Sequence, residues 1–346
     1  MIREKLIAKT ATPSPLRAEV FEKLKGMVRP IEDLEEREIV ELPKIVTPWM
    51  PDPSLVEVYS PTNVGKTWFS LGLAYSVTRG IPFGIPGWKT VPTPVLYVDG
   101  EQPLADLKRR SHVFRLEEPG TAPFWYLSSE DTLNFVGAIN ISDRDWQEFL
   151  VEFCKERGIR LLILDNLVSL CSGVDFNKMD EWARINGWFM DMRRHGISCL
   201  FLHHSGKELS RGSLGSSTIQ TNINAVIALR KPENYTTEDA CRFICTLEKD
   251  KVLPDEKELV RPTDWILRDR KDGAATWLVR ESQTEETFEA DMSVLQCFLE
   301  KKAQGDIVKE MKAKPYTISR IKKRLIRKGY LLENGEVTEK GKEICS

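Results

Sequence analysis

One short segment limits the folds open to this 346-residue chain more than any other feature. It is SPTNVGKT at residues 60–67, which follows an apolar run at residues 55–59 and precedes helical spacing at residues 68–79. A loop between a strand and a helix start presents backbone N–H groups and the positive helix end to a phosphate. The segment therefore predicts a P-loop, and with it a sheet that carries the loop at one edge.

The rest of the central region supports this prediction. From about residue 55 to 280, strand-like and helix-like segments alternate, and several of the strand-like runs are continuously apolar. Such runs are typical of strands buried on both faces, so we expect an α/β fold with a mostly parallel central sheet. The expected strands are residues 55–59, 95–99, 124–127, 161–165, 199–203, 225–229 and 243–247.

The two ends of the chain differ from this central region. Residues 1–45 are charged and interrupted by prolines, with helical spacing at residues 16–27, and are expected to form an arm. Residues 46–285 form the predicted ATPase domain. In residues 290–346, three short helices at 292–301, 307–311 and 317–328 precede the tight-turn pair Asn334-Gly335. This order predicts a small winged helix-turn-helix domain.

Composition excludes several classes of protein. Hydrophobic residues make up 41% and charged residues 29%, which excludes collagen-like, mucin-like and wholly disordered chains. The longest apolar runs are far shorter than the ~20 residues of a membrane-spanning helix, so we expect no membrane partner. The N-terminus has no apolar stretch of the secretory type, which favours a cytoplasmic protein. The seven scattered cysteines are expected to be reduced core thiols and not metal ligands.

The P-loop assigns the phosphate contacts. Lys66 is expected to reach the β- and γ-phosphates of ATP, and the Thr67 hydroxyl to bind Mg²⁺. Serine stands at the position where the motif has its first glycine, and a strained backbone angle there would be harder for serine. The predicted nucleotide-binding residues are Ser60, Thr62, Asn63, Val64, Gly65, Lys66, Thr67 and Trp68.

Polar side chains end the neighbouring strands. Glu101, just after the run at residues 95–99, is the candidate that activates the attacking water, and Asp99 is the competing choice. Asp165 closes four apolar residues, where a carboxylate needs a partner such as Mg²⁺. Of the pair His203-His204, the second is expected to touch the γ-phosphate.

Two groups of cations in the central region are candidates for contacts outside the phosphate site. Lys207 and Arg211 lie in a Ser- and Gly-rich loop suited to a nucleic-acid backbone. Lys249 and Lys251 are spaced to share a face at the end of a late strand, from which they could reach the γ-phosphate of a neighbouring subunit. An exposed, charged strand end is the alternative interpretation of that pair.

The set GKT, VLYVDGE, LLILDN, FLHHSGK and RGS, within residues 45–250, resembles the RecA-like ATPases of the hexameric-helicase branch. Closest in pattern are the RepA-type plasmid replicative helicases and their relatives among the AAA-labelled P-loop ATPases. The resemblance implies a RecA-like P-loop NTPase core, a homo-oligomeric ring usually of six subunits, ATP between neighbours, and single-stranded DNA in the channel.

The resemblance also implies roles for single residues. Glu101 corresponds to the catalytic base, Asp165 to the Walker B acid and His204 to the γ-phosphate sensor. RepA-type members place an arginine finger shortly after the RGS segment, but residues 218–224 hold no arginine. The Lys249 and Lys251 pair resembles the finger of RecA and DnaB-type motors instead, and Arg211 and Arg230 stay as alternatives.

The C-terminal segment differs in charge from the rest of the chain. Residues 301–346 contain 13 Lys and Arg against 6 Asp and Glu, whereas residues 1–300 contain 37 against 46. Helical spacing directs Ile318, Ile321, Leu325 and Ile326 of the segment TISRIKKRLIRK to a core. The cations on its other faces favour duplex DNA as a partner, with protein docking or a solvated surface as the alternative. These cations are Arg320, Lys322, Lys323, Arg324, Arg327 and Lys328.

Together these features predict an ATP-dependent DNA-binding motor, of the kind represented by the replicative helicases of mobile elements. A second hypothesis is a DNA-binding regulator or recombination mediator in which ATP switches assembly without unwinding. A third is a scaffold with a degenerate nucleotide site, for which the serine at position 60 is the only sequence support.

Overall fold

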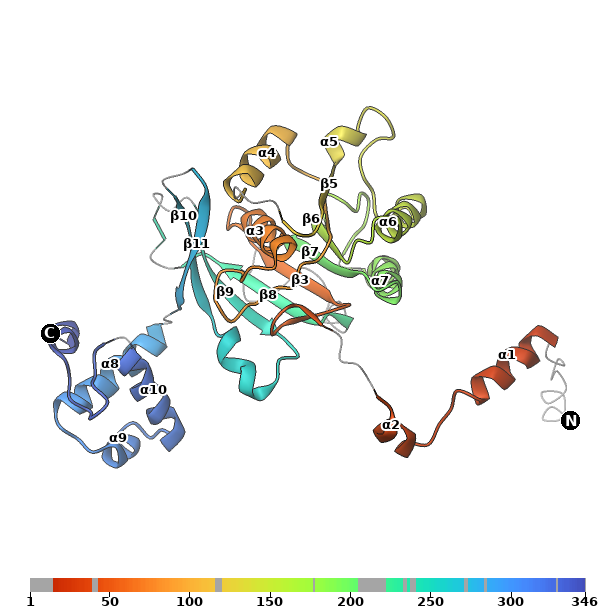
Figure 1. Cartoon of the computed structure of the whole chain (residues 1–346). Helices are drawn as coiled ribbons and strands as arrows, with labels where there is room; N and C mark the ends of the chain where they lie inside the picture. Colours follow the sequence, from red (N-terminus) through yellow and green to blue (C-terminus); the bar gives the residue numbers. More distant parts are fainter. Residues whose placement is uncertain are drawn as a thin grey trace, which may run out of the picture. The chain divides into compact units, whose positions relative to one another are not determined.

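The computed structural model describes residues 15–38, 43–115, 120–176, 178–204, 222–232, 235–236, 241–270, 273–282, 285–327 and 329–345. It divides into two units, Met1–Leu42 and Pro43–Ser346. Figure 1 shows the course of the chain through both units.

The first unit contains the helices α1 (Pro15–Lys25) and α2 (Glu32–Glu36). Helix α1 lies where the sequence shows helical spacing. Within residues 19–38, no described side chain is buried. This unit therefore has no core of its own in its described part, and it exposes the large apolar residues Val20, Phe21, Leu24, Met27, Val28, Ile31 and Leu34.

The second unit is built around one sheet. Its parallel strands are β3 (Leu55–Ser60), β4 (Val95–Asp99), β5 (Phe124–Ser128), β6 (Leu161–Asp165), β7 (Ser198–His204) and β8 (Ala225–Arg230). The strands β9 (Arg242–Lys249), β10 (Thr263–Asp269) and β11 (Ala275–Glu281) extend it in antiparallel fashion. The order is β11-β10-β9-β8-β3-β7-β6-β4-β5. The predicted α/β fold with a mostly parallel sheet is confirmed.

Helices cover both faces of the parallel strands (Figure 1). Helix α3 (Lys66–Arg79) packs with α4 (Leu104–Val113) on one face, and α7 (Met179–Arg194) packs against β7 on the other, where α6 (Arg144–Glu156) also lies. Local signals set their ends: Asp143 caps α6 by accepting from the N–H of Asp145, and Gly80 ends α3 at φ +68°. Short elements accompany the sheet: β1 (Lys44–Val46), β2 (Met50–Pro51), α5 (Ser129–Thr132) and the 3₁₀ helix at Pro254–Val260.

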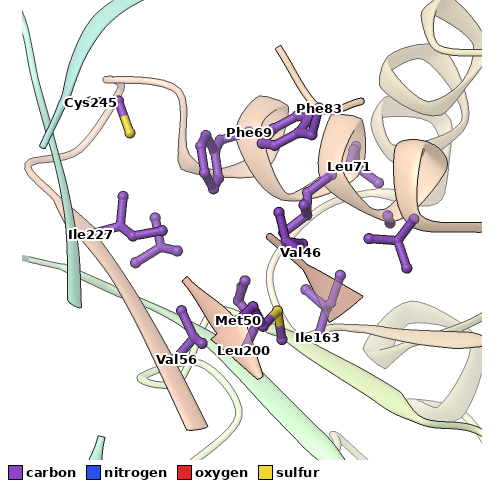
Figure 2. Packing of buried hydrophobic residues seen from close by; sticks show 14 of the residues in the cluster. Val46, Met50, Val56, Phe69, Leu71, Phe83, Ile163, Leu200, Ile227 and Cys245 are labelled. Atoms are coloured by element: carbon purple, nitrogen blue, oxygen red, sulfur yellow. The ribbon is translucent and has the colours of Figure 1, made fainter. Parts of the chain in front are cut away.

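Alternation along the strands produces two cores. Val56, Ile163 and Leu200 point to the α3 face, where they meet Phe69, Leu71 and Phe83, as Figure 2 shows. Their chain neighbours Leu55, Leu162 and Phe201 point to the opposite face and join the core beneath α6 and α7. Because both faces of the sheet are buried, functional side chains are expected at the carboxyl ends of the parallel strands.

The C-terminal segment has a third, separate core. Helices α8 (Glu285–Leu299), α9 (Gln304–Glu310) and α10 (Pro315–Arg327) bury Val294, Ile307, Ile318 and Leu325. An antiparallel bridge joins Leu331 to Val337 across the Asn334-Gly335 turn, in which Gly335 has φ +88°. Helix α11 (Glu339–Cys345), which the sequence did not predict, follows.

No helix in the described ranges is long and apolar enough to cross a membrane.

Candidate active site

The loop between β3 and α3 has the backbone of a phosphate cradle. Positive φ angles occur at Asn63 (+58°) and Gly65 (+130°), and Gly65 precedes the first turn of α3. A Cβ at Gly65 would lie 2.6 Å from Cys241 Sγ and 3.0 Å from Phe243 Cδ1. Glycine is required at position 65 both for its φ angle and for the close approach of β9.

Ser60 differs from its predicted role. Its φ is not positive, so the backbone strain expected from the loss of glycine is absent. Its side chain is buried and does not line the cleft. Instead, the Lys66 ammonium donates to Ser60 Oγ at 3.1 Å and to Ser60 O at 3.2 Å. Ser60 therefore holds the P-loop lysine, and the support for a degenerate nucleotide site disappears.

Lys66 and His204 meet at the tip of β7. Lys66 Nζ lies 3.2 Å from His204 Nδ1. Burial lowers the pKa of Lys66 to about 8, against the opposing effects of Asp165 and Glu101. Burial and the adjacent Lys66 also lower the pKa of His204, so this imidazole is neutral near pH 7. Because an ammonium group only donates, Nδ1 accepts and the proton resides on Nε2 of His204.

The two histidines of β7 point to opposite faces. His203 is 1% exposed, lies 3.3 Å from Glu57 Oε1 through Nδ1, and packs its ring against Phe176. His204 lines the cleft. The strand alternation thus directs His204 to the cleft, and its contact with the γ-phosphate stays a prediction.

Asp165 lies beside Thr67 at the end of β6. Its Oδ2 accepts hydrogen bonds from the Thr67 hydroxyl at 2.8 Å and the Tyr97 hydroxyl at 2.7 Å. Burial, followed by the charge of Asp99, raises the pKa of Asp165 to about 6. A buried carboxylate with neutral hydroxyl donors and an adjacent threonine oxygen fits a hard divalent cation. Thr67 and Asp165 are therefore the residues that would hold Mg²⁺.

The structure gives different surroundings to the two acids at the end of β4, Asp99 and Glu101. Asp99 is buried and accepts from the N–H groups of Glu101 (2.9 Å) and Gln102 (2.7 Å), which stabilises the turn. Glu101 is exposed to the cleft, and its Oε2 accepts from Asn166 Nδ2. Of the two alternatives, Glu101 lines the cleft and Asp99 does not, and the role of Glu101 as base stays a prediction.

These side chains converge on one cleft of about 410 Å³ at the carboxyl ends of the parallel strands. Its described lining includes the following residues: Thr62, Asn63, Val64, Gly65, Lys66, Thr67, Trp68, Glu101, Gln102, Pro103, Arg110, Asp165, Asn166, His204, Tyr235 and Cys241. A family model described as an AAA domain matches residues 22–210, more than half of the chain. The chain belongs to the AAA domain family. Its P-loop site is that of an ATPase, which implies ATP as substrate, ordinarily with Mg²⁺.

No curated protein matches the chain. Among the matching solved structures is that of a KaiC-like protein from the hyperthermophilic archaeon Pyrococcus horikoshii OT3, with 12% identity and a TM-score of 0.45. That match covers 70% of this chain and 99% of the archaeal chain.

Several residues at this ATPase site were missed from the sequence. Gln102 donates through Nε2 to Asp99 Oδ2 and accepts from Arg110 Nη1 at 2.6 Å. The Arg110 guanidinium also lies 5.6 Å from the centre of the Trp68 ring. Gln102 directly follows Glu101 and could have been found by adjacency. Arg110 and Tyr235 carry no local signal, because only the fold brings α4 and the segment before β9 to the cleft.

The predicted finger residues lie away from the cleft of their own chain. Lys249 ends β9 opposite Val226, toward the amino-terminal ends of the parallel strands, and Lys251 lies beyond the strand. The expectation that both lysines share one strand face is therefore wrong. Arg230 pairs with Glu248 Oε1 at 2.5 Å. Lys207 and Arg211 lie outside the described residues.

The cations of α10 are not equivalent. Arg320 and Lys323 are exposed, and Lys322 Nζ lies 5.7 Å from the centre of the Phe298 ring. Arg324 was expected on the DNA-binding face, but it is 9% exposed and binds the buried carboxylate of Asp291 through Nε and Nη2. Arg324 thus stabilises the C-terminal core. The side chain of Arg327 and residue 328 are not described.

Proposed function

We propose that the chain is an ATP-dependent DNA-binding motor resembling the RepA-type replicative helicases, with ATP hydrolysed between subunits of a homo-oligomeric, hexameric ring. The observation that carries the proposal is the convergence of Lys66, Thr67, Glu101, Asp165 and His204 on one cleft. Single-stranded DNA would pass through the ring, and the C-terminal module, interpreted as a winged helix, would bind duplex.

Five residues of the cleft have a proposed task in hydrolysis. Lys66 would bind the β- and γ-phosphates after leaving its oxygen partners on Ser60. Glu101 would accept a proton from the water whose oxygen attacks the γ-phosphorus, while ADP leaves. The Nε2–H of neutral His204 would donate to a γ-phosphate oxygen as charge develops there. Mg²⁺ would neutralise part of the phosphate charge from its place beside Thr67 and Asp165.

The finger is the part of the site that a second subunit would supply. Among the described residues lining the cleft, the basic side chains are Lys66, Arg110 and His204. Lys249 and Lys251 lie elsewhere in their own chain, which is compatible with a contact to a neighbour's γ-phosphate. In this proposal the neighbouring subunit completes the charge around the γ-phosphate, so hydrolysis requires an oligomer.

Steady-state ATP hydrolysis with no DNA, single-stranded DNA and duplex tests this function. We expect strong stimulation by single strands and a ring-sized solution mass. Glu101→Gln should lower kcat by about 10²-fold or more, because it removes the base. The matched control is Glu152→Gln, an exposed glutamate of α6 outside the cleft, which should behave as wild type.

The opposite result identifies the alternative. Equal, slow turnover in all three conditions from a monomer or dimer would contradict the motor. It would favour the regulator or recombination mediator, in which ATP switches assembly. If single strands do stimulate hydrolysis, directional unwinding of a duplex separates a helicase from a translocase without strand separation.

A further inference from the structure

Asn166 contacts the candidate base from the tip of the neighbouring strand. It follows Asp165, is 2% exposed, and accepts through Oδ1 from the Ser169 N–H at 3.1 Å and the Ser169 hydroxyl at 3.3 Å. A flipped amide would place its NH₂ group against the Ser169 N–H, a donor that cannot rotate away. The Nδ2 atom of Asn166 therefore faces the cleft, where it donates to Oε2 of Glu101.

Close packing of two turns brings Asn166 and Glu101 together. The Gly100 N–H donates to Asp165 O at 2.8 Å and so joins the tips of β4 and β6. A Cβ at Gly100 would lie 2.8 Å from Leu170 Cγ and 3.2 Å from Ser169 Cβ. Because Leu170 is fully buried, it has little room to yield. Glycine at position 100 thus allows the Glu101 turn to rest on the Asn166 turn.

We propose that Asn166 is a positioning residue for ATP hydrolysis, which holds Oε2 of Glu101 so that Oε1 faces the attacking water. The proposal rests on the proposed role of Glu101 as base. A carboxylate accepts through both oxygens, so one can be anchored while the other takes the proton. Glu101 is exposed, whereas Asn166 is buried and held by hydrogen bonds from Ser169. A misplacement of about 1 Å is enough to cost about 10²-fold in rate.

The neutral amide suits the charges around Glu101. Asp99 approaches from β4, Asp165 from β6, Lys66 from α3 and His204 from β7. A cation at position 166 would hold the carboxylate ionised and weaken it as a base, whereas an acid would repel it. An amide N–H orients the carboxylate without adding charge to the site.

The test measures kcat, the KM for ATP and ADP affinity for Asn166→Ala, alone and combined with Glu101→Gln. We expect kcat to fall about 10- to 100-fold, with KM and ADP affinity within about 2-fold of wild type. The double variant should hydrolyse ATP at the rate of Glu101→Gln alone, because Asn166 acts through the glutamate. The matched control is Asn140→Ala, which removes a similar Asn–Ser turn, with Ser142, outside the cleft.

Asn166→Asp supplies a readout that loss of structure would not produce. This variant keeps an oxygen for Ser169 but places a second carboxylate against Glu101. We expect the acidic limb of the kcat profile to move toward higher pH, since two adjacent carboxylates resist joint ionisation. In Asn166→Ala that limb should move much less, because this variant loses one neutral hydrogen-bond donor and adds no charge.

The outcomes distinguish the positioning role of Asn166 from the proposed role of Glu101 as the base. Full activity of Glu101→Gln would remove the base itself, and with it the proposed hydrolytic mechanism. If Glu101→Gln is inactive but Asn166→Ala keeps wild-type kcat, only the positioning role is overturned. An equal further loss in the Glu101→Gln background, or a parallel loss of ADP affinity, would also overturn it.

Discussion

The buried carboxylate of Asp165 lowers the folding stability of the nucleotide-free protein at neutral pH. Its carboxylate is buried among hydroxyl donors, and burial together with Asp99 raises its pKa to about 6, well above the 3.8 of a free side chain. The folded state therefore binds this proton more tightly than the unfolded chain does. Stability is lost as the pH rises from about 4 to about 6, and the loss persists at neutral pH. A divalent cation bound beside Thr67 would compensate it.

Asp165→Asn should accordingly stabilise the nucleotide-free protein while abolishing hydrolysis. At pH 7.5 the gain is up to about 3 kcal/mol, since each pKa unit corresponds to about 1.4 kcal/mol. The gain should shrink toward zero near pH 4, where the wild-type carboxyl is protonated. Thermal unfolding across this pH range measures it, with Asp143→Asn, an exposed helix cap, as the control. A variant less stable than wild type at pH 7.5 would contradict the argument.

At the scale of elements, the hairpin β10–β11 closes the core around α3. Trp265 of β10 is fully buried, stacks on Phe243 and lies 4.9 Å from Phe83 between ring centres. Gly84, at φ +70°, packs so closely that a Cβ would lie 2.0 Å from Trp265 Cη2. This contact attaches the antiparallel half of the sheet to the segment that follows the P-loop helix.

Gly84→Ala and Gly137→Ala separate backbone strain from crowding. Both glycines have positive φ, but nothing lies within 4 Å of a Cβ built at Gly137. Gly137→Ala should cost about 1 to 2 kcal/mol of unfolding free energy from strain alone. Gly84→Ala should cost about 1 to 3 kcal/mol more, because Trp265 cannot move aside. Denaturant unfolding gives both values, and equal losses would show that the core near Trp265 relaxes freely.

Some of these strands and site residues could be predicted from the sequence, and others could not. The buried parallel strands were predictable because their apolar runs are continuous, and Lys66, Thr67 and Asp165 because the motif fixes them next to those runs. Strands β10 and β11 were missed, because each has only three consecutive apolar residues and lies in the antiparallel part of the sheet, where long apolar runs are not required. Asn166 contacts Glu101, and Arg110 lies over the ring of Trp68. These residues are far apart in sequence, so the contacts follow only from strand order and helix placement.

At the scale of the whole molecule, the described part of the chain has three separate hydrophobic cores, and charge is unevenly distributed along the sequence. The two cores of the sheet and the C-terminal core share no residue among those described. The C-terminal segment 301–346 carries 13 Lys and Arg against 6 Asp and Glu, whereas the preceding 300 residues are acidic on balance. A polyanion is therefore expected to bind this module without occupying the ATPase cleft.

Charge reversal on α10 tests whether that binding uses one helix face or net charge alone. Lys323→Glu should weaken duplex DNA binding and reduce the salt slope of log Kd by about 1, as the loss of one phosphate contact does. Lys342→Glu on α11 makes the same change in net charge at another exposed position and should have a much smaller effect. DNA-free ATP hydrolysis should be unchanged in both variants, because neither lysine lines the cleft. Equal losses in both would mean that duplex binding depends on diffuse charge, and the proposed recognition by α10 would have to be abandoned.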